Sequence, residues 1–149
     1  MKHLTEYKLF ESYYDDIVRQ GMSRIFPGVE DEVNDILAYL KDDGFKIGVK
    51  IGVNFSPEVP IFHVYVYKSK SLFDINSAPF KFSAVKNDMI ALKNNLSDRF
   101  NVLRCRVMPD GDCFNTSSFN KGGYGYFNQF IDRKGSTSAN FVEIEFIKK

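Results

Sequence analysis

The stretch FKIGVKIGVN, residues 45–54, decides the fold class of this chain. Its large apolar residues recur at every second position, with lysine, glycine or asparagine between them, which is typical of a β-strand with one buried face. Immediately before it, residues 29–43 place Val33, Ile36, Leu37 and Leu40 at helical spacing, and Gly44 predicts the end of that helix. The change of period at Gly44 predicts a chain that contains both helices and strands.

The C-terminal side repeats this alternation. Residues 61–67, 101–108 and 141–147 each read as a strand, and Pro57 and Pro60 predict an irregular connection between the first of them and residues 45–54. A helix over residues 83–96, capped by Ser83, separates two of the strands. In the strand 101–108, we expect Leu103, Cys105 and Val107 to face the core and Arg104 and Arg106 to face outward.

The remaining segments are a helix and polar connections. Residues 5–26 carry apolar residues at helical spacing, weakened at Gly21, and predict an N-terminal helix. Residues 109–123 are rich in Gly, Asp, Asn and Ser and predict a long loop, residues 124–131 an irregular strand, and residues 132–140 a polar turn region.

These elements predict one α+β domain over residues 1–149, with an antiparallel or mixed sheet of four or five strands and helices packed on one face. A chain of 149 residues with 44% hydrophobic and 26% charged residues is typical of a globular domain. Neither a membrane-spanning segment nor a secretion signal is apparent, so we expect a cytoplasmic protein without a membrane partner.

The net charge of +1 hides an asymmetry along the chain. Residues 1–43 carry a net charge of −5 and the remainder carries +6. Acidic helices and basic strands could complement one another within the fold, or one basic face could receive an anionic partner. Both interpretations stay open at the level of sequence.

Residues for catalysis or metal binding are few. His63, a lone histidine on a strand face, is interpreted as structural or solvent-exposed rather than catalytic, since no nucleophile can be placed against it. Cys105 and Cys113 are interpreted as reduced thiols in a strand and a loop. Asp110 and Asp112 fit a turn better than a calcium loop. The acidic residues of the helix 29–43 fit a solvated first turn. The sequence therefore predicts a protein that is not an enzyme and has no cofactor or metal ion.

One group of residues stands out on the sheet. If the alternating apolar residues face the helices, the other face displays cations and rings, which suit the phosphates and bases of a single strand. The candidate nucleic-acid-binding residues are Lys46, Lys50, Tyr65, Tyr67, Arg104 and Arg106, with His63 among them. Glu143 and Glu145 project from the same side and could neutralise the arginines across strands, and the helix 5–26 could cover the face.

Two resemblances concern short motifs. Val64-Tyr65-Val66 and Gly123-Tyr124-Gly125-Tyr126 resemble the paired motifs of the RNA recognition motif family, although Gly122 and Gln129 replace a basic residue and an aromatic residue of its longer motif. Tyr7-Lys8-Leu9-Phe10-Glu11-Ser12, Asp42-Asp43-Gly44-Phe45 and Leu96-Ser97-Asp98-Arg99-Phe100 resemble small accessory proteins of tailed bacteriophages. The second resemblance implies a viral protein made in a bacterial cytoplasm and no particular activity.

The preferred function from sequence is an interaction module that docks on a host or viral protein. The docking surface is expected in the loop 109–123, with Phe114 and Phe119 as anchors, or on the acidic helix 29–43. Binding of single-stranded nucleic acid by the sheet face is the alternative. The sequence leaves the oligomeric state open.

Overall fold

The fold is built from short helices and one large sheet. The computed structural model describes residues 16–55, 58–70, 78–108, 113–115 and 138–149. Residues 16–20 are helical and are followed by α2 (Met22–Ile25), α3 (Val29–Ile36), α4 (Ala38–Asp42) and α5 (Lys86–Leu96), with a short 3₁₀ helix at Phe82–Ala84. The strands are β1 (Lys46–Phe55), β2 (Glu58–Tyr67), β3 (Phe80–Lys81), β4 (Phe100–Met108), β5 (Cys113–Asn115), β6 (Ser138–Ala139) and β7 (Phe141–Lys148).

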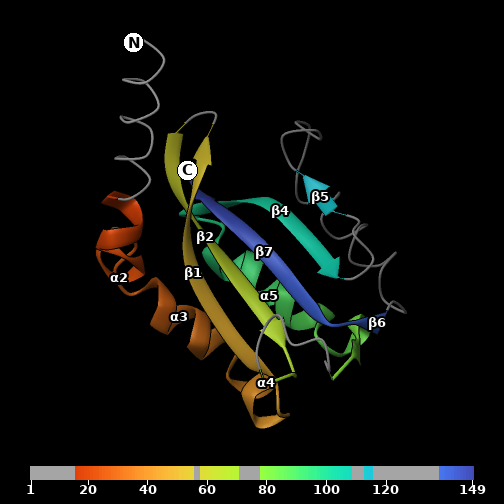
Figure 1. The fold of residues 1–149 in the computed structure, drawn as a ribbon. Coiled ribbons are helices and arrows are strands. Elements are labelled where there is room, and N and C mark those ends of the chain that lie inside the picture. Colours follow the sequence, from red (N-terminus) through yellow and green to blue (C-terminus); the bar gives the residue numbers. More distant parts are fainter. Residues whose placement is uncertain (1–15, 56–57, 71–77, 109–112, 116–137) are drawn as a thin grey trace.

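Five strands form one antiparallel sheet in the order β1-β2-β7-β4-β5. β1 and β2 pair along their full lengths as a hairpin. β7, the last strand in the sequence, lies between β2 and β4 (Figure 1). A second sheet contains only β3 and β6. The α+β class, with an antiparallel sheet at its centre, is confirmed.

The core lies between one face of the sheet and the helices. Phe62, Val64 and Val66 of β2 alternate toward it, as do Val142, Ile144 and Phe146 of β7, and all six are buried. The apolar residues of α3, α4 and α5, and Leu37 between α3 and α4, cover them; these residues are Val33, Leu37, Leu40, Met89, Leu92 and Leu96. Figure 1 shows α5 running behind β2 and β7. The expectation of helices on one face is confirmed for these elements.

None of the helices in the described part of the chain has the length and apolar character needed to cross a lipid bilayer.

Gly44 ends the second helical segment, as its sequence position predicts. Its φ is +87°, its N–H donates to the Lys41 carbonyl at 3.1 Å, and the Phe45 N–H donates to the Leu40 carbonyl at 2.9 Å. This pair of bonds is the Schellman arrangement, in which a residue with positive φ closes the helix and two apolar side chains meet across it. The motif places Phe45 at the start of β1 and against the core.

The helical segments are more divided than their periodicity predicts. Residues 29–43 form two helices because the chain tightens at Leu37, where the Leu40 N–H bonds to the Leu37 carbonyl in a 3₁₀-type turn. Gly21, with φ +76°, separates the helical residues 16–20 from α2. The first part of the predicted helix 5–26 lies outside the described residues.

Two predicted element boundaries are wrong. β2 begins at Glu58 and includes Pro60. Its pairing with β7 starts only at Ile61, so the N–H that proline lacks is not needed for a hydrogen bond to β7. Ser83 is not the cap of α5, since it belongs to the 3₁₀ helix and Val85 occupies the N-cap position without a side-chain cap.

The predicted orientation of Leu103 is also wrong. The register between β4 and β7 shifts between Val102 and Arg104, so Leu103 is the additional residue of a β-bulge. This β-bulge turns both Val102 and Cys105 toward the core and leaves Leu103 half-buried. Cys113 lies in β5 rather than in a loop, and residues 138–139 form a strand within the predicted turn region.

Prediction for the core. Phe62 is fully buried between the rings of Phe26, Phe100 and Phe146, with centroid distances of 5.0–5.1 Å. Phe62→Ala should lower the free energy of unfolding by about 3–5 kcal/mol, because the cavity cannot collapse between rings held by separate elements. Chemical denaturation measures the change. Tyr39→Ala is the control, since the Tyr39 side chain is 80% exposed and its loss should have little effect.

Candidate binding face

The face of the sheet opposite the core, called the outer face below, is arranged in rows across the strands. One row contains Lys50, His63, Glu145 and Arg104, and the neighbouring row contains Gly48, Tyr65, Glu143 and Arg106. Lys46 and Tyr67 lie opposite each other in the next row. Residues paired in register project to the same side, so the structure brings all six predicted nucleic-acid-binding residues to one face.

The two central residues of this face are buried carboxylates. The side chains of Glu143 and Glu145 are only 1% and 4% exposed, although they point away from the apolar core. Arg106 donates to Glu143 Oε2 through Nε at 3.1 Å and also through Nη2, and Arg104 Nη2 donates to Glu145 Oε1. Two carboxylates out of contact with water need such partners, because an unpaired buried charge is strongly destabilising.

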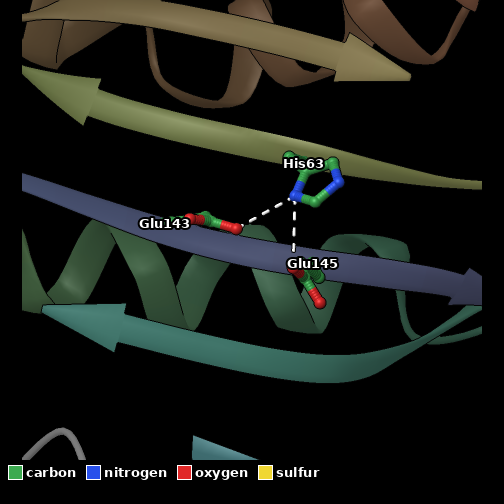
Figure 2. A group of neighbouring side chains, drawn as sticks. All are labelled: His63, Glu143 and Glu145. Carbon is green, nitrogen blue, oxygen red and sulfur yellow. Dashed lines mark hydrogen bonds and ion pairs between the residues drawn. The ribbon is translucent and has the colours of Figure 1, made fainter. Parts of the chain in front are cut away.

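His63 lies between the same two carboxylates. Its Nδ1 is 2.9 Å from Glu143 Oε1 and 3.3 Å from Glu145 Oε1, so a single nitrogen faces both side chains (Figure 2). The imidazole projects from β2 toward β7, and its side chain is 18% exposed. The sequence does not show that His63 meets these two carboxylates, because they lie on a strand that is distant in the sequence.

Glycines of β1 make room for the rings of β2. A Cβ added to Gly52 would lie 2.5 Å from Nε2 of His63, so a larger residue there would displace the imidazole. At Gly48 the nearest atoms would be those of Tyr65 and Tyr67 at 3.8–3.9 Å, which is ordinary contact. His63 and Tyr65 stack with parallel rings 5.9 Å apart, and Lys50 Nζ lies 5.8 Å from the centre of the Tyr65 ring.

The network shifts the pKa of two groups in opposite senses. Burial alone would raise the pKa of Glu143, but hydrogen bonds from His63 and Arg106 outweigh it and lower the pKa to about 2. Burial, followed by the negative charge of Glu143, raises the pKa of Tyr65 to about 12. At neutral pH the glutamate is ionised and the phenol keeps its proton.

The outer face is less basic than its arginines alone suggest. Arg104 and Arg106 neutralise Glu145 and Glu143, which confirms the cross-strand pairing expected as one interpretation of the sequence. The exposed pair of Arg99 with Glu32, at 2.6 Å, likewise joins the basic part of the chain to the acidic helix. Phe26 packs on Phe62 and Phe100, so the described end of the predicted helix 5–26 reaches the core side rather than the outer face.

The predicted protein-docking residues are only partly described. Phe114 lies in β5, paired with Cys105 in register, and nothing is described of its side chain. Phe119 lies outside the described residues. The acidic helix 29–43 is formed by α3 and α4, where Glu30, Asp31 and Glu32 occupy the first turn and Tyr39 is 80% exposed.

Prediction for the buried carboxylate. A carboxyl group whose pKa is lowered in the folded state stabilises the fold above the pKa of the unfolded chain, and this stabilisation is lost as the pH falls. The free energy of unfolding should therefore decrease between about pH 4.5 and about pH 2, by at most about 3 kcal/mol for Glu143. Denaturant titrations at a series of pH values measure this slope.

Glu143→Gln should flatten the slope, whereas Glu32→Gln, which removes an exposed ion pair, should leave it unchanged. Equal slopes in the native protein and in Glu143→Gln would contradict the assignment of the lowered pKa to Glu143.

The comparisons with known proteins identify no relative. No family model matches this chain, and no curated protein and no solved structure shows significant similarity to it.

Proposed function

We propose that the protein is a small binding module whose outer face holds single-stranded nucleic acid. The observation that carries the proposal is the gathering of Lys46, Lys50, Tyr65, Tyr67, Arg104 and Arg106 on one face of adjacent strands. Cations that meet phosphates and rings that stack on bases are the two components of single-strand recognition.

The charge of the face favours an anionic partner. Four cations and two carboxylates leave a formal charge of +2 when His63 is neutral. Lys46 and Lys50 are exposed on β1, and the side chains of Arg104 and Arg106 remain 38% and 32% exposed despite their ion pairs. A guanidinium carries five donors, so pairing with a glutamate does not prevent contact with a phosphate oxygen.

The aromatic residues supply surfaces for bases. Tyr65 and Tyr67 are separated by one residue on β2, so they project to the same side about 7 Å apart along the strand. Both side chains are half-buried and lie beside Gly48, which has no side chain to cover them. Base stacking of this kind tolerates any sequence, and we therefore propose little sequence preference.

A binding role rather than catalysis is part of the proposal. The carboxylates that would act as acid or base, Glu143 and Glu145, are at most 4% exposed, and arginines hold them in place. A general acid or base must come within hydrogen-bond reach of its substrate.

We place this role in the cytoplasm of a phage-infected bacterium, on the resemblance of the short motifs to phage accessory proteins.

Prediction for nucleic-acid binding. A fluorescently labelled single strand of mixed sequence should bind, and its affinity should fall steeply with added salt as counterions are released. Lys46→Ala with Lys50→Ala should reduce the slope of log affinity against log salt by about 1.4, since each phosphate contact on a single strand contributes about 0.7. Tyr67→Ala should weaken binding about fivefold or more.

Lys41→Ala on α4 is the matched control, because it removes an exposed lysine that lies in the acidic helix segment. Fluorescence anisotropy between 50 and 200 mM salt measures all four proteins. Absence of binding at the lower salt, or the same salt slope in the double variant, would contradict the proposal.

A second candidate function is docking on a basic protein through the acidic helix segment 29–43. The observation that favours it is Tyr39, a residue of α4 that is 80% exposed, with Asp42 and Asp43 following in the chain. An exposed aromatic residue among charges can anchor a protein interface. The sequence also predicts Phe114 and Phe119 as docking residues, but the docking proposal made here depends on Tyr39 alone.

Prediction for protein docking. A photo-reactive amino acid placed at position 39 should form a defined cross-link with a basic partner in infected cells. The same group at position 55 should not, although Phe55 is also an exposed aromatic residue, at 54%. Products that are identical at the two positions, or absent from both, would contradict docking at Tyr39.

A further inference from the structure

We propose that His63, Glu143 and Glu145 form a binding site for one zinc ion on the outer face. The three side chains come from two adjacent strands, and their ligand atoms all lie within 4.8 Å of one another. Figure 2 shows Nδ1 of His63 facing both carboxylates. The site requires no nucleic acid, so its test is independent of the test of the proposed function.

The two distances from Nδ1 to the carboxylate oxygens suit one shared ion. With bonds of about 2.1 Å, separations of 2.9 and 3.3 Å from Nδ1 to the two Oε1 atoms correspond to angles of about 87° and about 104° at the ion. These angles lie near those of octahedral and tetrahedral coordination. Oε1 of Glu145 also accepts a hydrogen bond from Arg104 Nη2, so zinc would have to displace this contact to bind there.

The types of ligand favour zinc over magnesium or calcium. One imidazole nitrogen with two carboxylate oxygens is a mixed set that zinc accepts, whereas magnesium and calcium take oxygen ligands. Zinc would take the place of the hydrogen bond between Nδ1 and Glu143. Three protein ligands leave at least one coordination position for water or for an anionic ligand.

The arginines both support and limit this site. Arg106 bonds to Oε2 of Glu143 and so keeps Oε1 directed toward His63, as partners of metal ligands commonly do. The two guanidinium groups also repel a further cation, because they already balance both carboxylates. We therefore expect weaker zinc binding than the same three ligands would provide without them.

Gly52 gives this site a sensitive test that removes no ligand. A methyl group at position 52 would approach Nε2 of His63 to 2.5 Å, so Gly52→Ala must move the imidazole away from its present position. Gly48→Ala lies on the same strand, faces the same side and meets no atom closer than 3.8 Å. Both variants exchange glycine for alanine in β1, and they differ in whether they displace His63.

The experiment titrates the chelator-treated protein with zinc in competition with a chromophoric chelator. The native protein should bind one equivalent. His63→Gln, Glu145→Gln and Gly52→Ala should each lower the affinity at least tenfold, and Gly48→Ala should stay within twofold of the native protein. Nitrogen NMR of the imidazoles should show a zinc-dependent shift of His63, with His3 as the only other histidine in the chain.

Three results would overturn the proposal: no zinc binding by the native protein, one equivalent bound with unchanged affinity in Gly52→Ala and Glu145→Gln, or the same response to magnesium. Circular dichroism identifies any variant that fails to fold. If a ligand variant fails to fold, the zinc affinities of Gly52→Ala and Gly48→Ala decide whether the site binds zinc, since neither substitution removes a charge.

Discussion

The constraint on which the structure depends is the burial of β7 on both faces. Its residues Val142, Ile144 and Phe146 enter the apolar core, and Glu143 and Glu145 between them are buried on the other side. Removing two carboxylates from water is costly unless cations and hydrogen bonds replace the solvent. The neighbouring strands provide these partners, with arginines on β4 and the imidazole on β2. The strand order and the charge pattern are thus two aspects of one arrangement.

This arrangement changes what the outer face can do. A face with four cations and no acids would attract any polyanion, but here half of the positive charge is used inside the sheet. What remains is concentrated on β1, beside the aromatic residues of β2. Affinity for a single strand should then depend on the lysines and the rings together, because neither provides enough interaction alone.

Sequence periodicity predicts much of this fold and less of its site. Alternation places β1, β2, β4 and β7 correctly because each strand has one strongly apolar face. It fails at Leu103, since a bulge adds a residue without altering local composition, and at Glu58–Pro60, since a strand end that pairs with β1 but not with β7 tolerates proline. It also cannot show that His63 and Glu145 are opposite each other, because that register joins strands 82 residues apart. The alternation within each strand nevertheless predicts that His63, Glu143 and Glu145 point away from the core.

The spacing of lysine and glycine in β1 is related to the register in which β1 pairs with β2. On the outward side of this strand, Lys46, Gly48, Lys50 and Gly52 alternate. Glycine weakens a strand interior, and at Gly52 its presence fits the close approach of another group, since a Cβ there would lie 2.5 Å from Nε2 of His63. At Gly48 the neighbouring atoms belong to Tyr65 and Tyr67 and lie at ordinary contact distance. The lysines between the glycines reach beyond the strand, since Lys46 Nζ donates to the Ser69 carbonyl at 2.8 Å and Lys50 Nζ lies 5.8 Å from the centre of the Tyr65 ring. The repeated sequence KIGVKIGV therefore serves both faces of the strand, with branched side chains for the core and room for rings outside.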